Sequence, residues 1–136
     1  MKTILCAVDD TDHSKDAVKV AADLAKSLGA KLSLITVNPL LAANGRGGIV
    51  SYLWDEAQCQ RFIDDASAAA RPVVPAATAI VKGRDISRSI VDYAEDHNID
   101  HIVVGSGEKG RLARTLLGSV SNDVVNRAHC PVTVAR

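Results

Sequence analysis

Residues 4–37 read ILCAVDDTDHSKDAVKVAADLAKSLGAKLSLITV, and this stretch alternates a strand, a helix and a second strand. Its first part, Ile4 to Val8, is a nearly continuous apolar run, which is typical of a strand buried on both faces of a parallel sheet. The middle part carries apolar residues at helical spacing, and Gly29 follows them where a helix C-terminus is expected. Leu32 to Val37 predicts the second strand, which Pro39 should end.

The same alternation continues to the end of the chain. Strands are predicted over 76–81, 101–104 and 132–135, helices over 52–70, 86–94 and 116–128, and a mobile Gly-rich loop over 42–50. Five strands separated by four helices imply parallel pairing through right-handed crossovers. We therefore predict an α/β fold: a three-layer sandwich in which an open, five-stranded, doubly wound parallel sheet is flanked by four helices. At this length, residues 1–136 are expected to form one domain.

The composition excludes several classes of protein. The 136 residues include 16 Lys and Arg and 16 Asp and Glu, and this zero net charge argues against a general nucleic-acid binder. Aromatic residues make up only 3%, too few to stack on bases or to sandwich a flavin. No apolar run approaches the roughly 18 residues of a membrane span. The three widely spaced cysteines, Cys6, Cys59 and Cys130, indicate free thiols in a reducing cytoplasm, where they act as small apolar core residues.

The segment after the fourth predicted strand carries the strongest functional signal. Residues 104–121 read VGSGEKGRLARTLLGSVS, a Gly-rich loop that ends where Gly118 and Ser119 open a helix. Glycines let backbone N–H groups approach an anion, and a helix N-terminus offers unpaired donors. The same residues fit an ordinary loop with a helix cap, so both interpretations stay open on composition alone. The segment contains no Walker A loop, and its G-x-G-x-x-G spacing is misplaced for a Rossmann fingerprint.

The chain resembles the universal stress protein family over essentially its whole length. The resemblance rests on Ile4 to Asp9, the helix opening Asp12-His13-Ser14, the strand Ile102 to Gly105, the segment Leu116 to Ser121, and the end His129 to Val134. The family has ATP-binding and nucleotide-free members. Binding members share the motif G-x2-G-x9-G-[ST], which holds ribose and phosphates.

This sequence keeps the two ends of that motif and departs from its middle. Gly105 matches the first glycine and Gly118-Ser119 the last pair, but Glu108 stands where the second glycine belongs. A carboxylate there repels phosphates, whereas Lys109 nearby offsets its charge if it points inward. By resemblance, Asp9 lies near the adenosine, Val37 near the adenine, and Ala7 at the pocket floor. The predicted nucleotide-binding residues are Ala7, Val8, Asp9, Val37, Gly105, Gly107, Lys109, Gly110, Gly118, Ser119, Val120 and Ser121.

The resemblance implies a cytoplasmic stress-response or signalling protein that binds ATP and forms a homodimer through its last strand. AMP is the alternative nucleotide, and Mg²⁺ could accompany the phosphates. The competing interpretation is a nucleotide-free member with a structural or interaction role, which Glu108 favours. An enzyme is not expected, because no general base or nucleophile motif is recognisable, although weak ATPase or autophosphorylation activity stays open.

Overall fold

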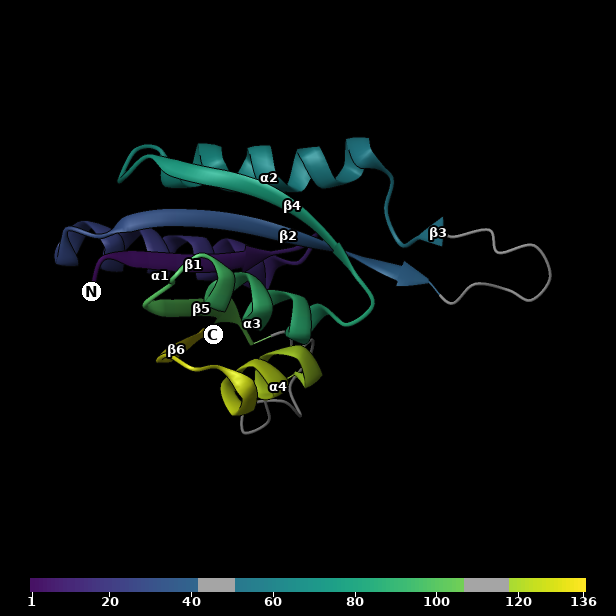
Figure 1. Ribbon diagram of the computed structural model, residues 1–136. Helices are drawn as coiled ribbons and strands as arrows, with labels where there is room; N and C mark the ends of the chain where they lie inside the picture. Colours follow the sequence, from purple (N-terminus) through teal and green to yellow (C-terminus); the bar gives the residue numbers. More distant parts are fainter. Residues whose placement is uncertain (42–50, 107–117) are drawn as a thin grey trace.

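The computed structural model describes residues 1–41, 51–106 and 118–136, so the predicted Gly-rich loop 42–50 lies outside the described residues. The elements alternate as the sequence predicts (Figure 1). Their bounds are β1 Thr3–Val8, α1 Asp12–Leu28, β2 Lys31–Leu41, β3 Ser51–Tyr52, α2 Glu56–Ala70, β4 Ala76–Gly83, α3 Ile86–Asp96, β5 His101–Gly105, α4 Ser119–Arg127 and β6 Val132–Ala135.

The main strands form one parallel sheet. β1 lies at its centre and pairs with β2 on one side and β5 on the other. β4 extends the sheet beyond β2, and β6 extends it beyond β5. β1 is followed by α1 and β2 on one side, whereas β5 lies on the other, so the strand order reverses at β1. Ligands bind outside the carboxyl ends of strands at such a reversal.

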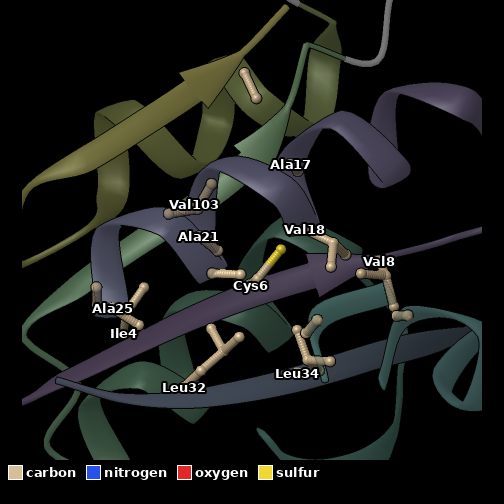
Figure 2. Close-up of a cluster of buried hydrophobic side chains, with 14 of the residues drawn as sticks. Ile4, Cys6, Val8, Ala17, Val18, Ala21, Ala25, Leu32, Leu34 and Val103 are labelled. Atoms are coloured by element: carbon tan, nitrogen blue, oxygen red, sulfur yellow. The ribbon is translucent and has the colours of Figure 1, made fainter. Parts of the chain in front are cut away.

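Two helices cover each face of the sheet, which gives the predicted three layers (Figure 1). α1 and α2 pack on one face over Ile4 and Cys6 of β1, and α3 and α4 pack on the other over Leu5. Figure 2 shows Cys6 directed from β1 toward Val18 and Ala21 of α1. Because neighbouring β1 residues enter opposite cores, the strand must be apolar at almost every position.

Local signals explain where the helices begin and end. The Thr11 hydroxyl accepts a hydrogen bond from the Ser14 N–H at the start of α1, and Gly29 ends this helix in the left-handed conformation at φ 63°. α2 begins with a capping box, in which the Asp55 carboxylate and the Gln58 side chain bind each other's backbone N–H groups. No helix in the described ranges is both long and apolar enough to cross a bilayer.

Three predicted boundaries are wrong. β2 continues through Pro39 to Leu41, because β1 pairs with it only as far as Thr36 and the Pro39 carbonyl accepts a hydrogen bond from Leu53 N–H. The 52–70 helix begins at Glu56 instead, since Tyr52 belongs to β3, a short antiparallel partner of β2 that was not predicted. The 116–128 helix begins at Ser119, because Gly118 has extended backbone and cannot lie inside a helix.

Candidate functional site

A cavity of about 180 Å³ opens at the carboxyl ends of β1, β2 and β5, where the strand order reverses. The N-termini of α1, α3 and α4 close it, so the site combines strand ends with helix starts. Its lining residues are Ala7, Val8, Asp9, Thr11, His13, Ser14, Val37, Trp54, Ile86, Ile90, Val104, Gly105, Gly118, Ser119, Val120 and Ser121.

Every predicted binding residue that the structure describes lies on this cavity. They are Ala7, Val8, Asp9, Val37, Gly105, Gly118, Ser119, Val120 and Ser121. The other three predicted residues, Gly107, Lys109 and Gly110, lie outside the described ranges, as does Glu108. The parallel topology thus brings together residues from three strands and one helix. Ala7 and Ser121, the first and last of them, are 114 positions apart in the sequence.

Asp9 is held rigidly at the end of β1. Its Oδ1 accepts hydrogen bonds from the Thr11 N–H at 2.8 Å, the Thr11 hydroxyl at 2.6 Å and the Ser14 hydroxyl at 2.7 Å. The Ser14 hydroxyl oxygen in turn accepts from the Asp9 N–H at 2.7 Å. Asp9 Oδ2 receives no hydrogen bond from the part of the chain that the structure describes. One carboxylate oxygen therefore organises the α1 cap, while the other is available to a ligand hydroxyl.

The end of β5 is tied to the start of α4. The Ser106 carbonyl accepts hydrogen bonds from the Gly118 N–H at 2.8 Å and the Ser121 hydroxyl at 3.0 Å. Ser106 and Gly118, the described residues on either side of positions 107–117, are therefore held next to each other. Gly118 caps α4 without a side chain, so no side chain satisfies the first-turn N–H groups of the helix, and Ser119 and Val120 of this turn line the cavity. Such a helix start attracts anions through its dipole and its free donors.

His13 lies against the same end of β5. A Cβ atom added at Gly105 would be 2.7 Å from the His13 carbonyl oxygen, so only glycine fits this position without displacing α1. The His13 Nδ1 is 3.3 Å from the Ser106 hydroxyl. The close packing of the α1 backbone on Gly105 thus places the imidazole at the cavity wall.

The far side of the cavity is apolar. Val37 of β2 and Ile86 and Ile90 of α3 line it together with Trp54. Asn38, which is 2% exposed, fixes Trp54 by donating from Nδ2 to its carbonyl oxygen at 2.7 Å and accepting from its N–H at 3.0 Å. The Trp54 ring meets Phe62 of α2 edge to face at 5.0 Å between centroids. One cavity therefore joins an apolar wall to an anion-attracting helix start, with a carboxylate beside them.

Comparison with known proteins agrees with this geometry. A model of the universal stress protein family matches residues 1–136. The chain belongs to the universal stress protein family. It is 33% identical to a universal stress protein of Methanocaldococcus jannaschii, over 99% of this chain and 82% of that protein. It is 32% identical to one from Thermus aquaticus, over 99% of this chain and 98% of that protein.

Solved universal stress protein structures share the fold. The structure from Archaeoglobus fulgidus superimposes with a TM-score of 0.79 at 22% identity, covering 100% of this chain and 99% of the other. An Archaeoglobus fulgidus universal stress protein in complex with dAMP gives 0.76 at 23% identity, covering 100% and 98%. A universal stress protein in complex with cAMP gives 0.75 at 22% identity, covering 99% and 97%. The predicted three-layer sandwich is confirmed.

Several lining residues of this universal stress protein were not predicted. They are Thr11, His13, Ser14, Trp54, Ile86, Ile90 and Val104. Thr11, His13 and Ser14 stand directly after the predicted Asp9, so proximity in sequence is a signal that could have identified them. Ile86, Ile90 and Trp54 carry no such signal, because only the packing of α3 and β2 brings them to the cavity.

The cysteines of this universal stress protein have no place in the site. Cys6 is fully buried in the core, and burial raises its thiol pKa to about 12. Burial also raises the pKa of the Cys59 and Cys130 thiols above 9.0, so all three are protonated at neutral pH. The described residues contain no group of three His, Cys, Asp or Glu side chains arranged to hold a metal ion.

Proposed function

We propose that this universal stress protein binds an adenine nucleotide in the cavity at the carboxyl ends of β1, β2 and β5. The observation that carries the proposal is that one cavity joins an apolar wall, the N-terminus of α4, which has no side-chain cap, and an Asp9 oxygen that accepts no hydrogen bond from the described residues. These three features match the three parts of a nucleotide: base, phosphate and ribose. The family relatives described in complex with dAMP and cAMP support adenine as the base.

Each part of the nucleotide has a matching group in the chain. Val37, Ile90 and Trp54 offer apolar surface to the base. Asp9 Oδ2 can accept a hydrogen bond from a ribose hydroxyl. The first-turn N–H groups of α4 and the Ser119 hydroxyl can donate to phosphate oxygens. ATP is the ligand that we propose, with AMP as the alternative. Mg²⁺ would have to be held mainly by the phosphates, because Asp9 is the only carboxylate among the described lining residues.

We extend the proposal to the biological role that the family membership suggests. The protein acts as a stress-response or signalling module in the cytoplasm, and its nucleotide is a bound effector rather than a substrate for turnover. It forms a homodimer through β6, which is an edge strand of the described sheet with Val132, Thr133 and Val134 each half-exposed. An open edge of this kind favours pairing with a second strand.

The test of binding uses the purified chain and a variant with a negative charge added at the start of α4. Nucleotide released by heat is identified by chromatography, and titration calorimetry with ATP and AMP gives the dissociation constants. Trp54 is the only tryptophan of the chain, so its fluorescence reports on the cavity independently. Ser119→Asp should weaken binding at least about tenfold by repelling phosphate, while its new charge favours the helix dipole and leaves folding intact.

Asn122→Asp is the matched control. It adds the same charge to α4, but Asn122 is exposed and lies outside the cavity, so binding should be unchanged. Wild-type protein that carries no nucleotide, gives no heat with ATP or AMP and shows no change in Trp54 fluorescence would refute the proposed function.

A nucleotide-free interaction dimer is the second candidate, and Glu108 is the observation that favours it. The carboxylate occupies the place of a motif glycine, next to where phosphates would lie by resemblance. Glu108→Gly separates the two functions. Binding that appears only in the variant supports the nucleotide-free role, whereas binding already present in the wild-type chain supports ours.

A further inference from the structure

The polar wall of the cavity has an unequal distribution of charge. Among the lining residues that the structure describes, Asp9 is the only carboxylate, and His13 is the only side chain able to carry a positive charge. The remaining polar groups are hydroxyls, backbone groups and the indole N–H of Trp54. Among the described lining side chains, His13 is therefore the only one that could offer a positive charge to an anionic ligand.

His13 is held in place by two contacts. Its backbone packs on Gly105 so closely that an added Cβ atom would lie 2.7 Å from the His13 carbonyl oxygen. Its ring is anchored at Nδ1, which is 3.3 Å from the hydroxyl of Ser106, a residue that is 5% exposed. With Nδ1 engaged, Nε2 is the nitrogen left for a ligand.

The anchor also places the ring near the anion-attracting end of the cavity. Ser106, which holds the ring through its side chain, accepts hydrogen bonds from Gly118 and Ser121 through its carbonyl oxygen. His13 is therefore separated from the start of α4 by a single residue. The apolar wall formed by Val37 and Ile90 comes from other elements, β2 and α3.

We propose that His13 determines specificity for the phosphorylated form of the ligand by donating a hydrogen bond from Nε2–H to its phosphate. Ser106 acts as the positioning residue that orients the ring. This inference rests on the proposed adenine-nucleotide function and adds to it a side chain that recognises the phosphate. It makes the cavity discriminate between a nucleoside and its nucleotide, because an uncharged nucleoside gains nothing from the imidazole.

The test measures the ratio of the dissociation constants for adenosine and AMP by titration calorimetry. In the wild-type chain AMP should bind more tightly than adenosine. His13→Ala should weaken AMP binding about tenfold or more, the usual effect of losing a hydrogen bond to a charged group, and leave adenosine binding unchanged. Ser106→Ala should lower the same ratio by a smaller factor. His129→Ala is the control, since His129 is exposed and lies outside the cavity.

The ratio separates a phosphate contact from a structural role. Equal losses for adenosine and AMP in His13→Ala would show that the residue only supports the cavity. Unchanged binding of both compounds would show that it does not contact phosphate. Either result overturns the inference while the proposed function stands. A wild-type chain that binds neither compound, nor ATP, overturns both.

Discussion

Gly105 lies at the end of β5 against His13 of α1, and its lack of a side chain allows the two backbones to pack closely. Gly105→Ala would place a Cβ atom 2.7 to 2.9 Å from three atoms of His13, two of them backbone atoms that cannot rotate away. We expect a loss of about 1–3 kcal/mol in the free energy of unfolding, typical of overpacking, together with weaker nucleotide binding because α1 moves at the cavity wall. Urea denaturation and calorimetry measure the two effects.

Gly29→Ala is the matched control for that substitution. Gly29 has φ 63° with no atom within 4 Å of an added Cβ, so the change costs about 1 kcal/mol through backbone strain alone and leaves the distant cavity intact. Binding that is lost equally in both variants would contradict the packing explanation.

We expect His101 to make the free energy of unfolding depend on pH. Its Nε2 is 2.7 Å from the Thr133 hydroxyl, and its Nδ1 is buried without a hydrogen-bond partner in the described structure. Burial lowers the pKa of this histidine below 6.5, so the unfolded chain takes up a proton at this site more readily than the folded chain. The free energy of unfolding should therefore be highest above about pH 6.5 and fall as the pH decreases through and below that value.

Urea denaturation at about pH 7.5 and about pH 5.5 measures this dependence. His101→Gln should reduce the difference between the two conditions, whereas His129→Gln, at an exposed position after α4, should not. An unchanged difference in His101→Gln would assign the effect to other groups. Asp85 and Asp100 are not among them, because hydrogen bonds lower the pKa of both carboxyls below 3.8.

The side chain of Asn38 in β2 fixes the chain at Trp54, just before α2. Asn38 binds the Trp54 backbone through both its donor and its acceptor, and Trp54 contacts Phe62 of α2 and the cavity. Asn38→Asp keeps the shape but replaces the Nδ2 donor with an oxygen facing the Trp54 carbonyl. We expect a loss of about 1–3 kcal/mol in stability and a shift in Trp54 fluorescence, with weaker nucleotide binding as the indirect result. Asn122→Asp, an exposed change in the N-terminal half of α4, should cause no such loss of stability or of nucleotide binding and no shift in Trp54 fluorescence. A Trp54 spectrum unchanged by Asn38→Asp would argue against the anchor.

Among the described parallel strands, β4 and β6 lie at the two edges of the sheet, and the proposed dimer uses β6. Ile102 N–H donates to the Pro131 carbonyl and Ser106 N–H to the Ala135 carbonyl, so odd-numbered β6 residues face β5. Val132 and Val134 therefore direct their N–H groups outward. Val134→Pro should remove an outward donor and convert the dimer to monomers while the pairing with β5 persists.

Light scattering after size-exclusion chromatography measures that change in mass. Ile80→Lys, which alters an exposed residue on the opposite edge strand β4, should leave the dimer intact. A wild-type chain of monomer mass, or a dimer lost only in Ile80→Lys, would refute pairing through β6.

The sequence by itself determined the layers, because the signals that define them are local. Apolar runs, helical spacing, Gly29 and the Asp9 to Ser14 segment each act over a few residues, and parallel topology follows from their alternation. Asp9 and residues 118–121 of the polar wall were therefore predictable from a strand end and a helix start. The position of Pro39 inside β2 and the pairing of β3 with β2 were not predictable, because both depend on hydrogen bonds to residues distant in the sequence.

Only the tertiary structure decided the rest of the site. Ile86, Ile90 and Trp54 look like ordinary apolar residues in sequence, and they become a cavity wall because α3 packs across the sheet and Asn38 fixes the chain after β3. His13 looked like part of a helix start, yet Gly105 and Ser106, more than 90 residues away, aim it at the cavity. Contacts between distant residues depend on how complete helices and strands pack against each other, and a local sequence pattern does not predict this packing.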